Sequence, residues 1–168
     1  MKRIFALILI FLMLCPFIVA CGDEEGTVKG VESSEGLKFD LNDDEKSYTL
    51  AGIGTCTAEN IVVDYYNGYP VTEIARNAMS RVESIKSLTI GDSVTFIGEM
   101  SFYGCENLVE VKIGEKVDTI GKNAFEKCIS LKEIVIPKGI KIVPMRAFSG
   151  CTSLESIVVA DDNPAYDS

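Results

Sequence analysis

The sequence predicts a short solenoid, a stack of similar coils that share one elongated core. Cysteine recurs every 23 residues in the second half of the chain, at Cys105, Cys128 and Cys151. Phenylalanine keeps the same interval, at Phe102, Phe125 and Phe148. Apolar residues also recur in windows that begin at positions 85, 108, 131 and 154. One coil cannot bury its own apolar edges, so stability comes from stacking about three or more of them.

Each repeat is expected to form one coil with a strand on one side. In the second repeat, residues 108–113 end in the apolar and polar alternation of a strand with one buried face, and Gly114 turns the chain. Val117 and Ile120 return it to the core. Residues 123–127 are too short for more than one helical turn. We therefore expect short parallel strands and, opposite them, one-turn helical or irregular segments.

These repeats resemble the BspA-type leucine-rich repeat, whose unit reads Leu-x-x-Ile-x-Ile-Pro-x-x-Val-x-x-Ile-Gly-x-x-Ala-Phe-x-x-Cys. The match is nearly complete from Leu131 to Cys151. It departs at Met79, which stands in place of Phe, at Val82, in place of Cys, and at Val143-Pro144, in place of Ile-Gly. The resemblance implies a leucine-rich repeat solenoid over residues 70–168, with the last repeat incomplete.

Upstream of the repeats, two alternating runs predict a β-hairpin that caps the first coil. These are residues 37–41 and 48–50, joined by the polar segment 42–46. The following residues look like an expanded first repeat, so residues 37–69 are assigned to the cap and this repeat. Its longer loop carries three tyrosines as candidate contacts, Tyr65, Tyr66 and Tyr69.

The N-terminus predicts export and a lipid anchor. Two basic residues precede a long apolar run, and Ile18-Val19-Ala20-Cys21 resembles the lipobox of bacterial lipoproteins. This resemblance implies a signal peptide at residues 1–20 and lipidation of Cys21. An uncleaved membrane span is the alternative, because the run approaches the ~20 residues that a spanning helix needs. Residues 21–36 are interpreted as an acidic flexible tether to a bacterial membrane, either the outer membrane or the membrane of a Gram-positive cell.

Composition argues against several classes of function. The formal charge is −9, which disfavours a nucleic-acid partner because phosphate binding needs clustered Lys and Arg. The chain has no His, the commonest general base and zinc ligand. The repeating cysteines also lack the close pairs of a structural zinc site. We therefore expect no enzymatic activity, no catalytic residues, no metal and no cofactor.

Four cysteines remain after the N-terminal segment, namely Cys56, Cys105, Cys128 and Cys151. An even number in an exported protein is compatible with disulfides. The other interpretation is that each coil has one buried slot for a small apolar side chain, which a free Cys can fill. Val82 occupies the equivalent slot and favours free thiols.

The outward strand positions provide a candidate partner-binding face. The positions between core residues form two columns, Ser87, Glu110, Glu133 and Ser156, and Thr89, Lys112, Val135 and Val158. The candidate face comprises Glu110, Lys112, Glu133, Val135, Ser156 and Val158. BspA-type proteins are associated with adhesion to host matrix proteins and other bacteria, so the resemblance implies a non-enzymatic surface protein that binds a protein or glycoprotein.

Two alternatives stay open. The first is a glycan-capturing lipoprotein that stacks sugars on its tyrosine loop. The second is a truncated or minimal repeat protein without a ligand, because residues 161–168 resemble a turn that would lead into a further strand. Such a protein would expose the apolar face of its last coil.

Overall fold

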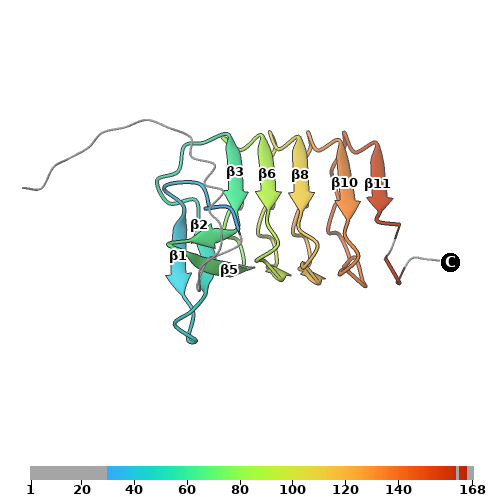
Figure 1. The fold of residues 1–168 in the computed structure, drawn as a ribbon. Helices are drawn as coiled ribbons and strands as arrows, with labels where there is room; N and C mark the ends of the chain where they lie inside the picture. Colours follow the sequence, from blue (N-terminus) through green and yellow to red (C-terminus); the bar gives the residue numbers. More distant parts are fainter. Residues whose placement is uncertain (1–29, 162, 166–168) are drawn as a thin grey trace, which may run out of the picture.

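The computed structural model describes residues 30–161 and 163–165, and in it the repeats form a solenoid with two sheets along the stack. The first sheet is the row of strands that stand side by side in Figure 1. In sheet order these are β3 (Asn60–Val63), β6 (Ser87–Ile90), β8 (Glu110–Ile113), β10 (Glu133–Ile136) and β11 (Ser156–Val159). All of its strand pairs are parallel.

The second sheet begins with the N-terminal strands and continues along the stack through two short strands. Its strands are β1 (Lys38–Leu41), β2 (Tyr48–Gly52), β5 (Tyr69–Ile74), β7 (Phe96–Ile97) and β9 (Thr119–Ile120), with β4 (Tyr65–Tyr66) paired to β5. The predicted hairpin is present, because β1 and β2 pair antiparallel. It lies at the edge of this sheet, where β2 pairs parallel with β5.

The repeat length sets the strand register. Ser87 pairs with Glu110, and Glu133 pairs with both Glu110 and Ser156, so residues 23 positions apart are neighbours. Within β10 the side chains alternate between exposed and buried, with Ile134 and Ile136 in the core. A register slip of one residue would bring these apolar side chains to the surface, and this fixes the alignment of the coils.

The segments between β7 or β9 and the next strand are hydrogen-bonded turns, and the described residues contain no helix. The irregular form of the expected segment is therefore the one that occurs. Met100 and Gly104 both have positive φ, and one left-handed residue is enough to end a right-handed helical turn. Neighbouring coils bond here directly: the Phe102 N–H donates to the Ala124 carbonyl at 2.8 Å.

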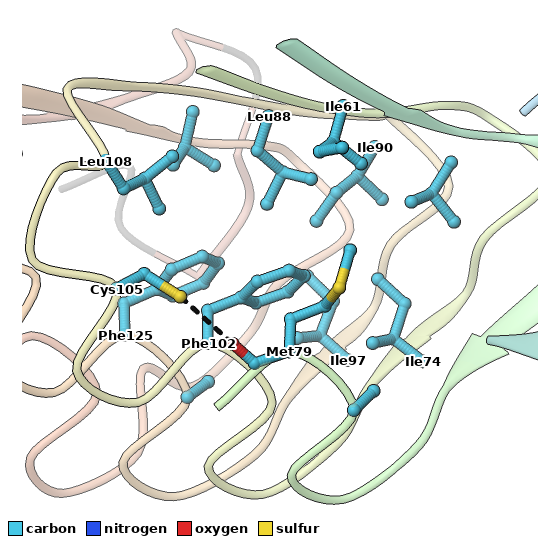
Figure 2. Close-up of a cluster of buried hydrophobic side chains, with 14 of the residues drawn as sticks. Ile61, Ile74, Met79, Leu88, Ile90, Ile97, Phe102, Cys105, Leu108 and Phe125 are labelled. Atoms are coloured by element: carbon cyan, nitrogen blue, oxygen red, sulfur yellow. Dashed lines mark hydrogen bonds between the residues drawn. The ribbon is translucent and has the colours of Figure 1, made fainter. Parts of the chain in front are cut away.

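A ladder of aromatic rings fills the core beneath these turns. Phe125 stacks between Phe102, with ring centroids 5.2 Å apart, and Phe148, at 5.7 Å. Met79 takes the same place one coil earlier and is fully buried (Figure 2). The long, unbranched Met fills the position that Phe has in the other coils, so the departure from the repeat pattern preserves the core.

Two residues of the predicted tether contact the first sheet. The N–H of Ser33 donates to the Tyr65 carbonyl at 2.7 Å, and that of Ser34 donates to the Val62 carbonyl at 2.9 Å. These residues therefore lie along β3 and pair with the otherwise open edge of the first sheet. These polar residues bind the edge through backbone and hydroxyl groups without needing a core of their own.

Candidate interaction surface

The outward positions of the first sheet form a surface, here called the strand face. Its members are in register on neighbouring strands, as Ser87 with Glu110, Glu110 with Glu133, Glu133 with Ser156, Thr89 with Lys112, and Val135 with Val158. The first expected column is thus continuous over four strands, and the second consists of the pairs Thr89–Lys112 and Val135–Val158. Parallel pairing at one repeat length is what brings together residues that lie far apart in the sequence.

Most side chains of the strand face on β8, β10 and β11 are exposed. Glu110, Lys112 and Glu133 are exposed, and Ser156 is half-buried. Val135 and Val158 are 44% and 43% exposed and lie side by side. They form a small apolar patch bordered by charged residues, as in an interface that has an apolar centre and a polar rim.

Two carboxylates face each other on this surface. Glu110 and Glu133 are directly opposite on adjacent parallel strands, a pairing that costs stability because like charges repel. Lys112 Nζ lies 3.3 Å from Glu110 Oε1, and the Ser156 hydroxyl donates to Glu133 Oε2 at 3.2 Å. Each carboxylate thus has a partner of its own, and both remain accessible to a ligand.

The face extends to β3, which the 23-residue spacing did not indicate. Asn60 pairs with Ser87, and Val62 pairs with Thr89. The Ser87 hydroxyl donates to Asn60 Oδ1 at 2.8 Å. The interval here is longer than in the later repeats because the β4–β5 excursion is inserted. Aligning the apolar pair Ile61 and Val63 with the buried residues of β6 would have revealed it.

The three predicted tyrosine contacts have different environments. Tyr66 stacks on Phe39, with ring centroids 4.3 Å apart, and meets Tyr48 edge-on at 5.0 Å. It therefore joins β4 to the hairpin and does not offer a free ring face. Tyr65 is half-buried, and its carbonyl accepts the N–H of Ser33. Tyr69 is 46% exposed and is the most accessible of the three.

The repeating cysteines are free thiols that belong to the core. The Cys105 thiol donates to the Met79 carbonyl at 3.1 Å, a contact drawn in Figure 2. The next two coils repeat it, from Cys128 to the Phe102 carbonyl and from Cys151 to the Phe125 carbonyl, both at 3.2 Å. Burial raises the pKa of Cys105 to about 11 and raises the pKa of Cys128 and Cys151 as well. These thiols are structural rather than nucleophilic.

The described residues contain no group of three or more His, Cys, Asp or Glu side chains arranged to hold a metal ion. Within the same residues, no helix is long and apolar enough to cross a membrane. Cys21, the predicted lipidation site, and the signal peptide before it lie outside the described part of the chain.

Several solved bacterial structures share this architecture. A leucine-rich repeat protein from Bacteroides capillosus is 30% identical, covers 74% of this chain and 94% of its own, and superimposes with a TM-score of 0.63. The Treponema pallidum leucine-rich repeat protein is 22% identical, with coverage of 74% and 69% and a TM-score of 0.59. A leucine-rich cell surface protein from Faecalibacterium prausnitzii is 23% identical over 75% of this chain and 38% of its own, with a TM-score of 0.53.

The sequence of the repeats also identifies their type. No curated protein matches the chain. The model of the BspA type leucine rich repeat region matches residues 70–165 in six copies. This stretch is more than half of the 168 residues and includes β6 to β11. The chain therefore belongs to the BspA-type leucine-rich repeat family.

Proposed function

We propose that this chain is an exported, lipid-anchored surface protein that binds a protein or glycoprotein through its strand face. The observation that carries the proposal is the exposed Val135 and Val158 pair beside the opposed carboxylates Glu110 and Glu133. An exposed apolar pair is available for association, and opposed carboxylates repel each other, so both features fit a surface that a partner covers. A partner that covers the valines and pairs with the charges would use both.

The proposed anchor is a diacylglycerol on Cys21. Several acyl chains on one residue would hold the protein on a membrane without a spanning helix, because each buried CH₂ contributes ~0.8 kcal/mol. To test this anchor, bacteria that express the full chain are grown in medium that contains radiolabelled palmitate. We expect label in the wild type and none in Cys21→Ser, with Cys56→Ser as the matched control. Label in Cys21→Ser would refute the anchor.

Binding is tested on the lipid-free chain with a panel of host matrix glycoproteins and bacterial surface proteins. Val135→Glu and Lys112→Glu should weaken binding about tenfold or more, because the first places a charge where the partner covers an apolar side chain and the second removes the cation of the face. Ile142→Glu is the matched control for the valine. Ile142 is 77% exposed and lies outside the first sheet, so it receives the same added charge without touching the strand face.

The outcome separates the proposal from its alternatives. Equal loss in Val135→Glu and Ile142→Glu would mean that the added charge matters and the strand face does not. A saturable partner that soluble oligosaccharide displaces, with binding lost in Tyr69→Ala, would favour glycan capture instead. The packing of Tyr66 against Phe39 argues against that reading, because only one of the three tyrosines is well exposed.

A further inference from the structure

The turns that precede β6, β8, β10 and β11 are here called the turn side. In each complete coil, this side has two residues in the left-handed conformation, four positions apart. These residues are Asn77 and Arg81, Met100 and Gly104, Asn123 and Lys127, and Arg146 and Gly150. Gly and Asn adopt this conformation at the lowest cost. Three of the four remaining residues are cations, in a chain whose formal charge is −9. Three cations of the turn side thus have a backbone conformation that costs energy for any residue with a side chain.

Two of these cations converge on one tyrosine. Arg81 Cζ lies 5.7 Å from the centre of the Tyr103 ring, and Lys127 Nζ lies 5.4 Å from it. Arg81 and Lys127 have equivalent positions two coils apart, and Gly104 occupies that position in the coil between them. A Cβ on Gly104 would lie 3.3 Å from Arg81 Cγ. The absent side chain leaves both cations room to reach the tyrosine of the middle coil.

The electrostatics of this cluster favour an anion. A hydrogen bond from Lys127, the charge of Lys127 and a hydrogen bond from Arg81 together lower the pKa of Tyr103, against the opposing effects of desolvation and of the Glu126 charge. The same hydrogen bond raises the pKa of Lys127. The phenol oxygen thus lies between two cations. A sulfate or carboxylate placed here would accept hydrogen bonds from charged donors, which are the strong kind.

The cluster borders a hollow of about 560 Å³ whose lining is part polar and part apolar. Arg81 and Arg146 are the cations that line this hollow, while Glu126, which accepts a hydrogen bond from the Asn123 amide, is its one acidic residue. The remaining wall includes Asn77, Ser80 and Met100. Amide and hydroxyl groups suit the hydroxyls of a sugar ring, and a hollow with a single aliphatic residue offers little to the apolar side chains of a peptide.

We propose that the turn side carries a second binding site, centred on Tyr103 between Arg81 and Lys127, that takes the sulfate or carboxylate groups of an acidic polysaccharide. It is independent of the strand face and of any partner bound there. The surrounding acidic surface limits the electrostatic attraction to this one place, so binding is weak per site and sensitive to salt.

The test measures binding of the full chain to dextran sulfate and to polygalacturonate, with neutral dextran as the uncharged control. The informative variants are Arg81→Gly and Lys127→Gly. Gly already occupies the equivalent positions in two coils, so these substitutions keep the fold while removing the cation. Each should weaken binding about tenfold, since each removes a charged hydrogen-bond donor. Lys116→Ala, an exposed lysine in another part of the coil, controls for net charge.

The binding results either support the site or overturn it. Loss in both Gly variants with retention in Lys116→Ala supports the site, and the ratio between the two polymers tells whether sulfate or carboxylate is preferred. Equal binding by all variants, or equal loss in Lys116→Ala, would overturn it. Binding of polyglutamate as tight as that of the polysaccharides would overturn the polysaccharide as the occupant. The ultraviolet titration of the tyrosines supplies a second readout. A bound anion should raise the pKa of Tyr103, so the polysaccharide should shift this titration in the wild type. Tyr103→Phe lacks the hydroxyl and should show no such shift.

Discussion

The first coil and the later repeats build one continuous core by different means. In the repeats, equivalent apolar residues stack at one register, and the contacts of one coil are copied in the next. At the N-terminal end, the structure instead relies on single polar contacts such as those of Asp64, whose Oδ2 accepts the Val31 N–H and whose Oδ1 accepts the Ser93 N–H. A repeat is stabilised by its two neighbours, whereas an end needs contacts that occur only once.

The largest effect should come from breaking the repeated core. Phe125→Ala removes a fully buried ring from the middle of the aromatic ladder, and such cavities cost about 3–5 kcal/mol. Urea denaturation of the wild type and variant measures the change in the free energy of unfolding. Phe96→Ala, at a residue 38% exposed, is the control and should cost much less. Equal losses would mean that full burial in the ladder adds nothing to the contribution of a phenyl ring.

Breaking the single contacts at the N-terminal end should cost less and act locally. Asp64→Ala leaves the Val31 and Ser93 N–H groups without their acceptor, a loss of about 2–3 kcal/mol. We expect hydrogen exchange of residues 31–34 to accelerate while β8 and β10 keep their protection. Asp92→Ala is the control, since its Oδ1 accepts the Glu115 N–H at an exposed site between two coils. Uniform acceleration along the chain would show that the end is not a separate unit.

The repeats could be predicted from the sequence because one spacing fixes both the register and the core. The departures at Met79 and Val82 were visible as well, since each is apolar and close to the size of the residue it replaces. The edge pairing of residues 31–34 was not, because it depends on backbone groups and on the hydroxyls of Ser33 and Ser34. No periodicity marks such contacts.

The same limit applies to the candidate sites. The columns of the strand face follow from the repeat, so Glu110 and Val135 could be placed in advance. The cluster around Tyr103 depends on Arg81 and Lys127 from two other coils and on positive φ values, neither of which a hydrophobic pattern reports.

One buried residue inside the repeats departs from the repeat pattern, and its substitution should stabilise the protein. Ser101 stands where the neighbouring coils have Ala78, Ala124 and Ala147. It is fully buried, and its hydroxyl is the only buried side-chain polar atom of the described residues without a hydrogen-bond partner. Ser101→Ala should therefore stabilise the protein by about 1 kcal/mol. Thermal or urea denaturation measures it, and a loss of stability would indicate that a bound water satisfies the hydroxyl.

The thiols offer a change that depends on pH. The pKa of Cys105 is raised by burial from 9.0 to about 11, so the folded protein holds this proton longer than the unfolded chain does. Its contribution to stability is complete below pH 9 and is lost as the pH rises from 9 to 11. Cys105→Val, which copies Val82, should cost about 1 kcal/mol at pH 7 and make the decline above pH 9 shallower. Urea titrations at pH 8 and pH 10 test this, and parallel curves for both proteins would refute it.

The smallest expected effect concerns the strand face, where stability and binding should oppose each other. Glu133→Gln removes the repulsion with Glu110 and keeps an oxygen that can accept the Ser156 hydroxyl, so it should stabilise the fold by a few tenths of a kcal/mol. Glu155→Gln, an exposed residue outside the strands, is the control. If the face binds a partner, the same variant should bind more weakly, because a stabilising substitution can still remove a charge the partner uses. A variant that is more stable and binds equally well would leave the opposed carboxylates without a role in recognition and would place the contact on the valines alone.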